Sequence, residues 1–385
     1  MSSLQNYLSK SLHTIKKANW YRHEKTISFL SHSLVEIEGK WLVNFASNDY
    51  LGLASDSRVI TGALEAIQKY GTGSTGSRLL SGHRPLHRQL EEALAQWKGS
   101  ENALVFSSGY QANLGTISAL VGKKDLILGD EYNHSSLKNG GKLSQAHCID
   151  YGHNNCQNLV NLLTQHRHNF RHCLITTDTV FSMDGDIAPL AELLDIANHF
   201  DCWLLVDEAH ATGVLGVTGA GCVEHFQLKG DNLIQIGTLS KAIGSLGGYV
   251  AGSNLLVEFL RNRCPTWIYT TALSPGDTGA ALTAVQIIPS ALHLRQQLWD
   301  NINHFKKLAK IHQIEFMDSD SAILCLKTPN AETALGLAQK LNLEGFLVPA
   351  IRPPTVPSSR LRFSLMATHS QEDLTSLMKI MSYEL

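Results

Sequence analysis

The feature that most constrains the fold of this chain is a series of short apolar runs, each long enough for one strand. The runs occupy residues 103–106, 126–129, 148–151, 173–177, 203–207, 233–237 and 248–251. Between two of them, residues 189–200 combine a proline suited to a first helical turn with apolar residues at 190, 193, 194 and 197. Strands that are apolar on both faces and alternate with helices are typical of a mostly parallel, covered sheet. We therefore predict an α/β fold across roughly residues 50–270.

The pattern changes after residue 275 to that of a smaller α+β domain. A long helical stretch at about 276–311 contains few helix breakers. It is followed by a predicted strand at 322–326, a helix at 331–341, a strand pair at 345–349 and 360–365, and a helix at 371–383. We predict an N-terminal segment 1–49 that packs with the small domain, a large domain 50–275, and a small C-terminal domain 276–385.

Charge and composition exclude several classes of protein. Lys plus Arg is 32 and Asp plus Glu is 34, so the formal charge is −2, whereas a nucleic-acid partner calls for a basic surface. No apolar run approaches the length of a membrane helix, and the first 20 residues lack the apolar stretch of a secretory signal. The seven cysteines form no Cys-x-x-Cys pair. We expect a cytoplasmic protein with reduced thiols and neither a nucleic-acid nor a membrane partner.

The 18 histidines are unusually numerous. Five of them, at 147, 153, 166, 168 and 172, crowd one region, but their spacing matches no metal-binding motif. We therefore expect no metal site and place most of the histidines at the surface.

Two short motifs resemble nucleotide-binding signatures without their context. Residues 71–76 match G-x-G-x-x-G, but they follow a helical pattern and not a strand, so we interpret them as a tight loop near a substrate or a neighbouring subunit. Residues 207–210 spell the Asp-Glu-Ala-His box of helicases. A nucleotide motor also needs a G-x-x-x-x-G-K-[ST] loop, which the sequence lacks.

A carboxylate and a lysine follow two successive strands. Asp207 ends the apolar run 203–207, and Lys241 comes shortly after the run 233–237. Taken alone, Asp207 is readily interpreted as a turn cap and Lys241 as a surface lysine. Together, at the strand ends where α/β sheets bind ligands, they fit a pyridoxal phosphate (PLP) site. The aspartate keeps the pyridine nitrogen protonated, and the lysine holds the aldehyde as a Schiff base.

Two further segments fit the same cofactor. Residues 107–113 follow a strand and open a helix, where backbone amides bind phosphate. His134 follows the run 126–129, where an imidazole can stack on the pyridine ring. The alternative for His134 is a histidine that caps a turn.

These segments resemble the α-oxoamine synthases, PLP-dependent enzymes of the aspartate-aminotransferase fold (fold type I). The resemblance extends from about Trp20 to the C-terminus. Its marks are residues 44–52 (Asn-Phe-Ala-Ser-Asn-Asp-Tyr-Leu-Gly), 73–78, 180–186, 206–210, 238–241 and 350–357.

The resemblance implies the cofactor contacts. Lys241 matches the Schiff-base lysine, Asp207 the partner of the pyridine nitrogen, and His210 a group near the phenolic oxygen. His134 matches the ring-stacking histidine, and with these three it forms the implied catalytic set. The remaining implied cofactor contacts are the phosphate loop at Gly109 and Tyr110 and the hydroxyls of Ser182, Thr238 and Thr271.

The resemblance also implies the substrate contacts and the assembly. Arg352 matches the arginine that grips an α-carboxylate, and the other implied substrate contacts are Arg22, Asn48, His134 and Thr355. Thr270 or Thr271 matches the residue that reaches the phosphate of the neighbouring subunit. A homodimer with shared active sites is therefore implied.

The activity implied by the resemblance is a decarboxylating condensation of an amino acid with an acyl thioester. Residues 350–357 resemble the biotin-pathway members, which join L-alanine to a pimeloyl thioester carried on coenzyme A or on acyl carrier protein. Alternatives are a glycine-using member such as 2-amino-3-oxobutyrate CoA ligase, an aminotransferase on the same scaffold, and a non-catalytic partner subunit. The presence of Lys241 disfavours the last of these.

Overall fold

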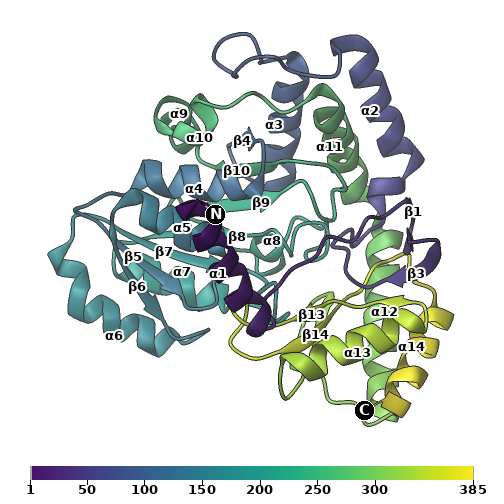
Figure 1. The fold of residues 1–385 in the computed structure, drawn as a ribbon. Helices are drawn as coiled ribbons and strands as arrows, with labels where there is room; N and C mark the ends of the chain where they lie inside the picture. The colour runs from purple at the N-terminus through teal and green to yellow at the C-terminus, as the bar shows by residue number, and fades with distance from the viewer. Residues whose placement is uncertain (1, 385) are drawn as a thin grey trace. The chain divides into compact units, whose positions relative to one another are not determined.

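The structure is a computed structural model that describes residues 2–384. Its chain divides into two compact units (Figure 1). The large unit comprises Asn48–Ser182 and Asp186–Gln297. The small unit comprises the chain up to Ser47, the short segment Met183–Gly185 and the chain from Leu298 onward. Within residues 2–384, every helix is too short or too polar to serve as a membrane span.

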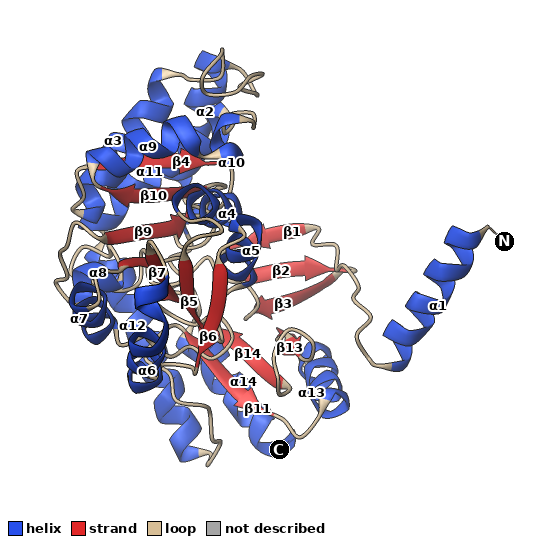
Figure 2. Cartoon of the chain, turned by 90° about the vertical axis from the view of Figure 1, so that its left-hand side faces the viewer, coloured by secondary structure: helices blue, strands red, loops and turns tan. Residues whose placement is uncertain are grey.

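A seven-stranded sheet forms the centre of the large unit, in the order β4-β10-β9-β8-β7-β5-β6 (Figure 2). The strands are β4 (Asn102–Phe106), β5 (Leu126–Asp130), β6 (His147–Tyr151), β7 (Cys173–Asp178), β8 (Trp203–Asp207), β9 (Leu233–Thr238) and β10 (Gly248–Gly252). Only β10 runs against its neighbours, β4 and β9. Each predicted apolar run therefore forms a strand, and the predicted α/β fold with a mostly parallel sheet is confirmed.

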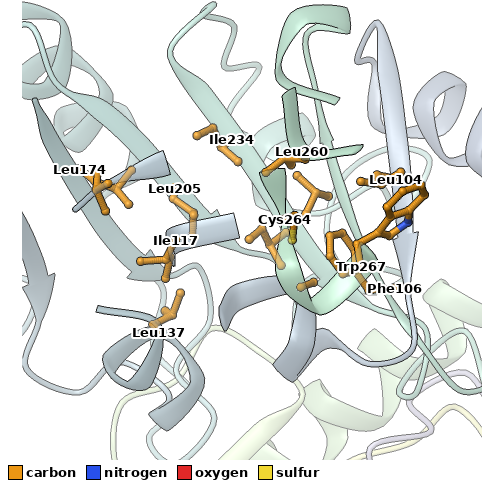
Figure 3. Packing of buried hydrophobic residues seen from close by; sticks show 14 of the residues in the cluster. Leu104, Phe106, Ile117, Leu137, Leu174, Leu205, Ile234, Leu260, Cys264 and Trp267 are labelled. Atoms are coloured by element: carbon orange, nitrogen blue, oxygen red, sulfur yellow. The ribbon is translucent and has the colours of Figure 1, made fainter. Parts of the chain in front are cut away.

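Helices cover this sheet and enclose its core. They are α2 (Ser57–Tyr70), α3 (Pro85–Lys98), α4 (Gly109–Leu120), α5 (Ser135–Ser144), α6 (Cys156–His166), α7 (Leu190–His199), α8 (Cys222–His225), α9 (Asn254–Arg263), α10 (Pro265–Ile268) and α11 (Pro275–Ile287). Buried side chains of the sheet, such as Leu205 and Phe106, belong to one hydrophobic cluster with Ile117 of α4 and Trp267 of α10 (Figure 3). Burying such apolar surface is the main force that holds strands and helices together.

The small unit contains two short sheets, ordered β1-β2-β3-β12 and β11-β14-β13. Its strands are β1 (Phe29–Ser31), β2 (Leu34–Ile37), β3 (Lys40–Asn44), β11 (Ile323–Lys327), β12 (Phe346–Leu347), β13 (Ala350–Ile351) and β14 (Arg360–Ser364). Its helices are α1 (Ser3–Lys17), α13 (Ala331–Leu343), α14 (Gln371–Glu384) and the later part of α12 (Leu292–Ile311).

The predicted pairing of 345–349 with 360–365 is wrong. The first of these segments divides instead, so that β12 joins β3 in parallel and β13 pairs with β14 antiparallel. Pro349 lies between β12 and β13. A proline has no N–H for a strand ladder, so it separates the two short pairings.

The predicted continuous helix over 276–311 is also wrong. Helix α11 ends at Ile287, a 3₁₀ turn follows at Ile288–Ser290, and α12 begins at Leu292. Pro289 explains the break, because a proline inside a helix loses a hydrogen bond and clashes with the preceding turn. Helix α11 packs on α2 and α3. The boundary between the compact units accordingly falls after Gln297, whereas we predicted it after residue 275.

Candidate active site

Two carboxylates end adjacent strands of the large sheet. Asp178 ends β7 and Asp207 ends β8, and the two residues are register partners. Asp207 is only 6% exposed. It accepts hydrogen bonds from Asn113 Nδ2 (2.6 Å) and from the backbone N–H of Ala209 (2.9 Å). No ion pair within residues 2–384 includes Asp207. A buried carboxylate with only neutral donors suits a ligand that brings a cationic N–H.

Asp178 is a site residue that the sequence analysis missed. Its carboxylate is buried and accepts the backbone N–H of His134 at 2.6 Å. Burial, and then the negative charge of Asp207, raise the pKa of Asp178 well above its usual range. Burial and the neighbouring charge therefore both favour the protonated form of Asp178. The available signal was its place directly after the apolar run 173–177.

Lys241 begins a hydrogen-bonded chain that reaches back to the start of the large unit. Its Nζ lies 2.9 Å from Nε2 of His210, and Nδ1 of His210 lies 2.6 Å from the Tyr50 hydroxyl. Tyr50 in turn donates to Asn48 Oδ1 at 3.3 Å. An ammonium donating to Nε2 of a neutral imidazole leaves Nδ1–H to donate to Tyr50, so every partner is satisfied. Tyr50 was not predicted as a site residue, although it lies in the motif at 44–52.

A second chain joins His134 to Asp207. Nδ1 of His134, which caps α5, lies 2.7 Å from the Ser136 hydroxyl. Asn113 Nδ2 bridges Ser136 Oγ, at 2.9 Å, and Asp207. Partial burial of its ring lowers the pKa of His134, which favours the neutral imidazole. Much of the residue stays exposed, as a ring that stacks on a bound cofactor requires.

The N-terminus of α4 lies against the end of β9. Ser108 caps the helix by accepting the N–H of Gln111, and α4 begins at Gly109. A Cβ on Gly109 would lie 3.2 Å from Cβ of Thr238, so glycine permits this close approach. The hydroxyls of Thr238 and Ser240 lie 2.7 Å apart. Free helix-end amides beside two hydroxyls provide the donors that a phosphate group needs.

The other predicted cofactor contacts lie in the first turn of α4 and on loops of the large unit. The Tyr110 hydroxyl accepts from Asn139, and its ring lies edge-on to His134 at 6.4 Å. Ser182 lies in the loop after β7, inside the bridge that joins residues 180 and 187. Thr271 has an exposed side chain and bridges to Ser77 in the loop that resembled a dinucleotide fingerprint.

Three of the predicted substrate contacts lie together in the small unit. Arg22 donates to the Thr355 hydroxyl at 3.2 Å, and both line a cavity of about 320 Å³ together with Arg352. The guanidinium of Arg352 donates to the backbone carbonyls of Asn19 (2.6 Å) and Tyr21 (2.7 Å). The other two, Asn48 and His134, belong to the large unit, where Tyr50 donates to Asn48.

Comparison with known proteins gives a consistent result. The model of the family described as aminotransferase class I and II matches residues 40–381. A relative from Gloeothece citriformis, named provisionally as an 8-amino-7-oxononanoate synthase, is 62% identical over 369 residues, covering 96% of this chain and 97% of the relative. Among solved structures, SPT with its PLP internal aldimine has a TM-score of 0.93 at 30% identity, covering 100% of this chain and 98% of the other. The 8-amino-7-oxononanoate synthase of Francisella tularensis has a TM-score of 0.78 at 33% identity, covering 89% and 97%.

Proposed function

The chain belongs to the class I and II aminotransferase family, whose cofactor is PLP, and we propose that it condenses L-alanine with a pimeloyl thioester. The products of this reaction are 8-amino-7-oxononanoate, carbon dioxide and the free thiol carrier, as a step of biotin synthesis. The observation that carries the proposal is the placement of buried Asp207 and of Lys241 after adjacent parallel strands. The names of the relatives, at 54–62% identity, supply the choice of products.

The residues of the large unit fit PLP. Asp207 would hold the proton on the ring nitrogen, and the N-terminus of α4 with Thr238 would hold the phosphate. His134 offers its exposed ring for stacking. When bound, PLP supplies an electron sink for the charge that develops on the amino-acid carbon.

Lys241 moves the proton in this proposal. As a free amine it removes the α-proton of alanine and later returns a proton to the product. His210 and Tyr50 hold its Nζ by the chain of hydrogen bonds described above. Holding the amine of Lys241 in one position increases the fraction of bound alanine molecules whose α-proton lies within its reach.

The small unit supplies the substrate contacts. Arg352 donates from two guanidinium nitrogens to neutral backbone carbonyls. A carboxylate is a stronger acceptor than a carbonyl for two parallel hydrogen bonds from a guanidinium. We assign Arg352 to the α-carboxylate of alanine, and Arg22 and Thr355 to further contacts with the substrates. Asn48, at the end of the chain from Lys241, is assigned to the same group of contacts.

The assembly and compartment are part of the proposal. The exposed hydroxyl of Thr271 suits a contact with the phosphate held by a second copy, in a homodimer with shared active sites. The seven cysteines are unpaired, as is typical of cytoplasmic proteins. The thioester carrier is either coenzyme A or acyl carrier protein.

The test is turnover with purified holoenzyme. L-alanine and glycine are each supplied with pimeloyl-CoA and with pimeloyl-acyl carrier protein, and carbon dioxide and the condensation product are measured. The proposal predicts 8-amino-7-oxononanoate from L-alanine with at least one carrier. Product formed only from glycine, or a keto acid formed by transamination, would contradict it.

A further inference from the structure

The imidazole of His153 joins three loops at the carboxyl end of the large sheet. Its Nδ1 lies 3.0 Å from Asp130 Oδ1, and its Nε2 lies 2.8 Å from Asp186 Oδ2. His153 follows β6, Asp130 ends β5, and Asp186 follows the segment that carries Ser182. Both ring nitrogens face carboxylates, and an imidazole donates from both nitrogens only when it is protonated.

The ring of His153 also contacts two aromatic residues that lie next to proposed cofactor contacts. The ring of His153 stacks on Tyr132, with centroids 4.4 Å apart and planes at 23°. It meets Phe181 edge-on, also at 4.4 Å. Tyr132 lies two residues before His134, and Phe181 directly precedes Ser182. His153 therefore contacts the two loops close to the residues assigned to the cofactor.

Neighbouring groups complete the bridge. Asn154 donates its backbone N–H to Asp130 Oδ2 at 2.8 Å and its side-chain amide to Asp186 Oδ2 at 2.7 Å. The backbone N–H of His153 donates to Glu131 Oε1 at 2.9 Å. The bridge thus joins the turn after β6 to both neighbouring loops.

The protonated imidazole places a cation beside a buried carboxylate. Asp130 is fully buried and also accepts the backbone N–H groups of Tyr132 and Asn154, at 2.8 Å each, and a buried carboxylate is least costly where a cation and several donors face it. The groups that face His153 are the carboxylates of Asp130, Glu131 and Asp186 and the phenol ring of Tyr132. Burial opposes the charge of the imidazole, yet the hydrogen bonds and charges of Asp130 and Asp186 raise the pKa of His153 to about 10.

We propose that His153 is a positioning residue for the cofactor: as an imidazolium clamped between Asp130 and Asp186, it fixes the loop of His134 relative to the loop of Ser182. The inference rests on the proposed function only through the roles of His134 and Ser182 as cofactor contacts. It concerns PLP affinity and loop order, which are measured without the acyl substrate.

The experiment compares His153→Gln with His172→Gln. Glutamine keeps an N–H donor and loses the charge. The ring of His172 is also stacked on an aromatic residue, Trp203, with centroids 4.8 Å apart. Trp203 begins β8, whereas Asp207 of the proposed site ends it. Apo-protein is titrated with PLP, and hydrogen exchange of residues 130–136 and 179–187 is measured in the apo-protein at pH 7.5.

We expect His153→Gln to weaken PLP binding about tenfold or more, because a buried carboxylate loses its cation. Exchange should speed up in both segments and stay unchanged at 203–210, while His172→Gln matches the parent within about twofold. The PLP affinity of the parent should also fall as the pH rises through about 10, and this step should be absent in His153→Gln.

A second variant separates positioning from general damage. Asp186→Asn removes the negative charge that faces Nε2 of His153. Its effect on PLP affinity should therefore not add to that of His153→Gln in the double variant. Parent-like affinity and exchange in both single variants would overturn the inference. Fully additive effects would overturn it as well. A holoenzyme that binds PLP yet forms no 8-amino-7-oxononanoate would instead count against the proposed function alone.

Discussion

Asp207 is a buried carboxylate that accepts only neutral N–H donors within the described chain. We predict that Asp207→Asn lowers kcat by about a hundredfold or more, because Asp207 would form a buried charge pair with the protonated ring nitrogen of PLP, and removing one partner of such a pair costs about 3–5 kcal/mol. Asp195→Asn, at an exposed position on α7, is the control and should leave kcat unchanged. A kcat for Asp207→Asn within about threefold of the parent would show that the charge of Asp207 plays no part.

Tyr50 is the middle of the chain that holds Lys241. We predict that Tyr50→Phe lowers kcat about three- to tenfold, since a hydrogen bond contributes about 0.5–1.5 kcal/mol. The matched control is Tyr249→Phe, because Tyr249 is also fully buried but its hydroxyl faces Thr212 at 2.8 Å. Steady-state kinetics and thermal unfolding of both variants separate an effect on kcat from a loss of stability. If the two variants lose stability equally and neither loses kcat, Tyr50 serves the fold alone.

Single site residues were predictable where they end an apolar run or lie within a few residues of its end. Lys241, Asp207 and His134 carry this local signal. The contact between Tyr50 and His210 joins residues 160 positions apart, and the contact of Asp178 with Asp207 depends on strand register. Neither can be deduced from local pattern. The role of His153 could not be predicted for the same reason, because its partners come from two other loops.

Among the elements, β10 sets how closely the N-terminus of α4 approaches the sheet. A Cβ on Gly248 would lie 2.4 Å from the backbone N of Gly109. We predict that Gly248→Ala displaces the helix start, weakens PLP binding about tenfold and costs about 1–3 kcal/mol of stability. Gly122→Ala is the control, because its Cβ would meet only Ser144 O at 3.8 Å. PLP titration and urea unfolding measure both effects, and unchanged PLP affinity in Gly248→Ala would refute this account of the phosphate site.

Elements of the large sheet were predictable because each apolar run is short and bounded by polar residues. The errors lie in the last third of the chain. Apolar periodicity continues across Pro289, so the pattern alone suggested one helix where the missing N–H divides α11 from α12. Pro349 has the same effect between β12 and β13.

At the scale of the whole molecule, each compact unit contains a buried neutral histidine. Burial lowers the pKa of His87 in the large unit, and of His369 in the small unit, to about 4. His87 accepts the N–H of Arg84 and faces Leu273 O, while His369 accepts the N–H of Met366 and faces Asn44 O. Each ring is thus held in its neutral form.

These two histidines predict a loss of stability in acid. A histidine with a lowered folded pKa stabilises the protein above its unfolded pKa of 6.5, and this contribution is lost as the pH falls from 6.5 through about 4. Each histidine should cost up to about 3 kcal/mol by pH 4. Urea unfolding between pH 7 and 4 is the measurement, with His87→Gln and His369→Gln for comparison. A pH dependence that is as steep in both variants as in the parent would contradict the prediction.

The small unit is assembled from segments far apart in the chain, and sequence patterns cannot predict such an assembly. Strand β12 pairs with β3 across some 300 residues, and Met183–Gly185 belongs to this unit although the sequence around it does not. A local pattern contains no information about such pairings.

The most direct measurement identifies the lysine to which PLP is attached. Holoenzyme is reduced with borohydride, digested, and the phosphopyridoxyl peptide is located by mass spectrometry, with Lys241→Ala as the control. The label should lie on Lys241, and the variant should carry none. A label on another lysine, such as Lys138 of α5, or full synthase activity in Lys241→Ala, would contradict the assignment of the active site.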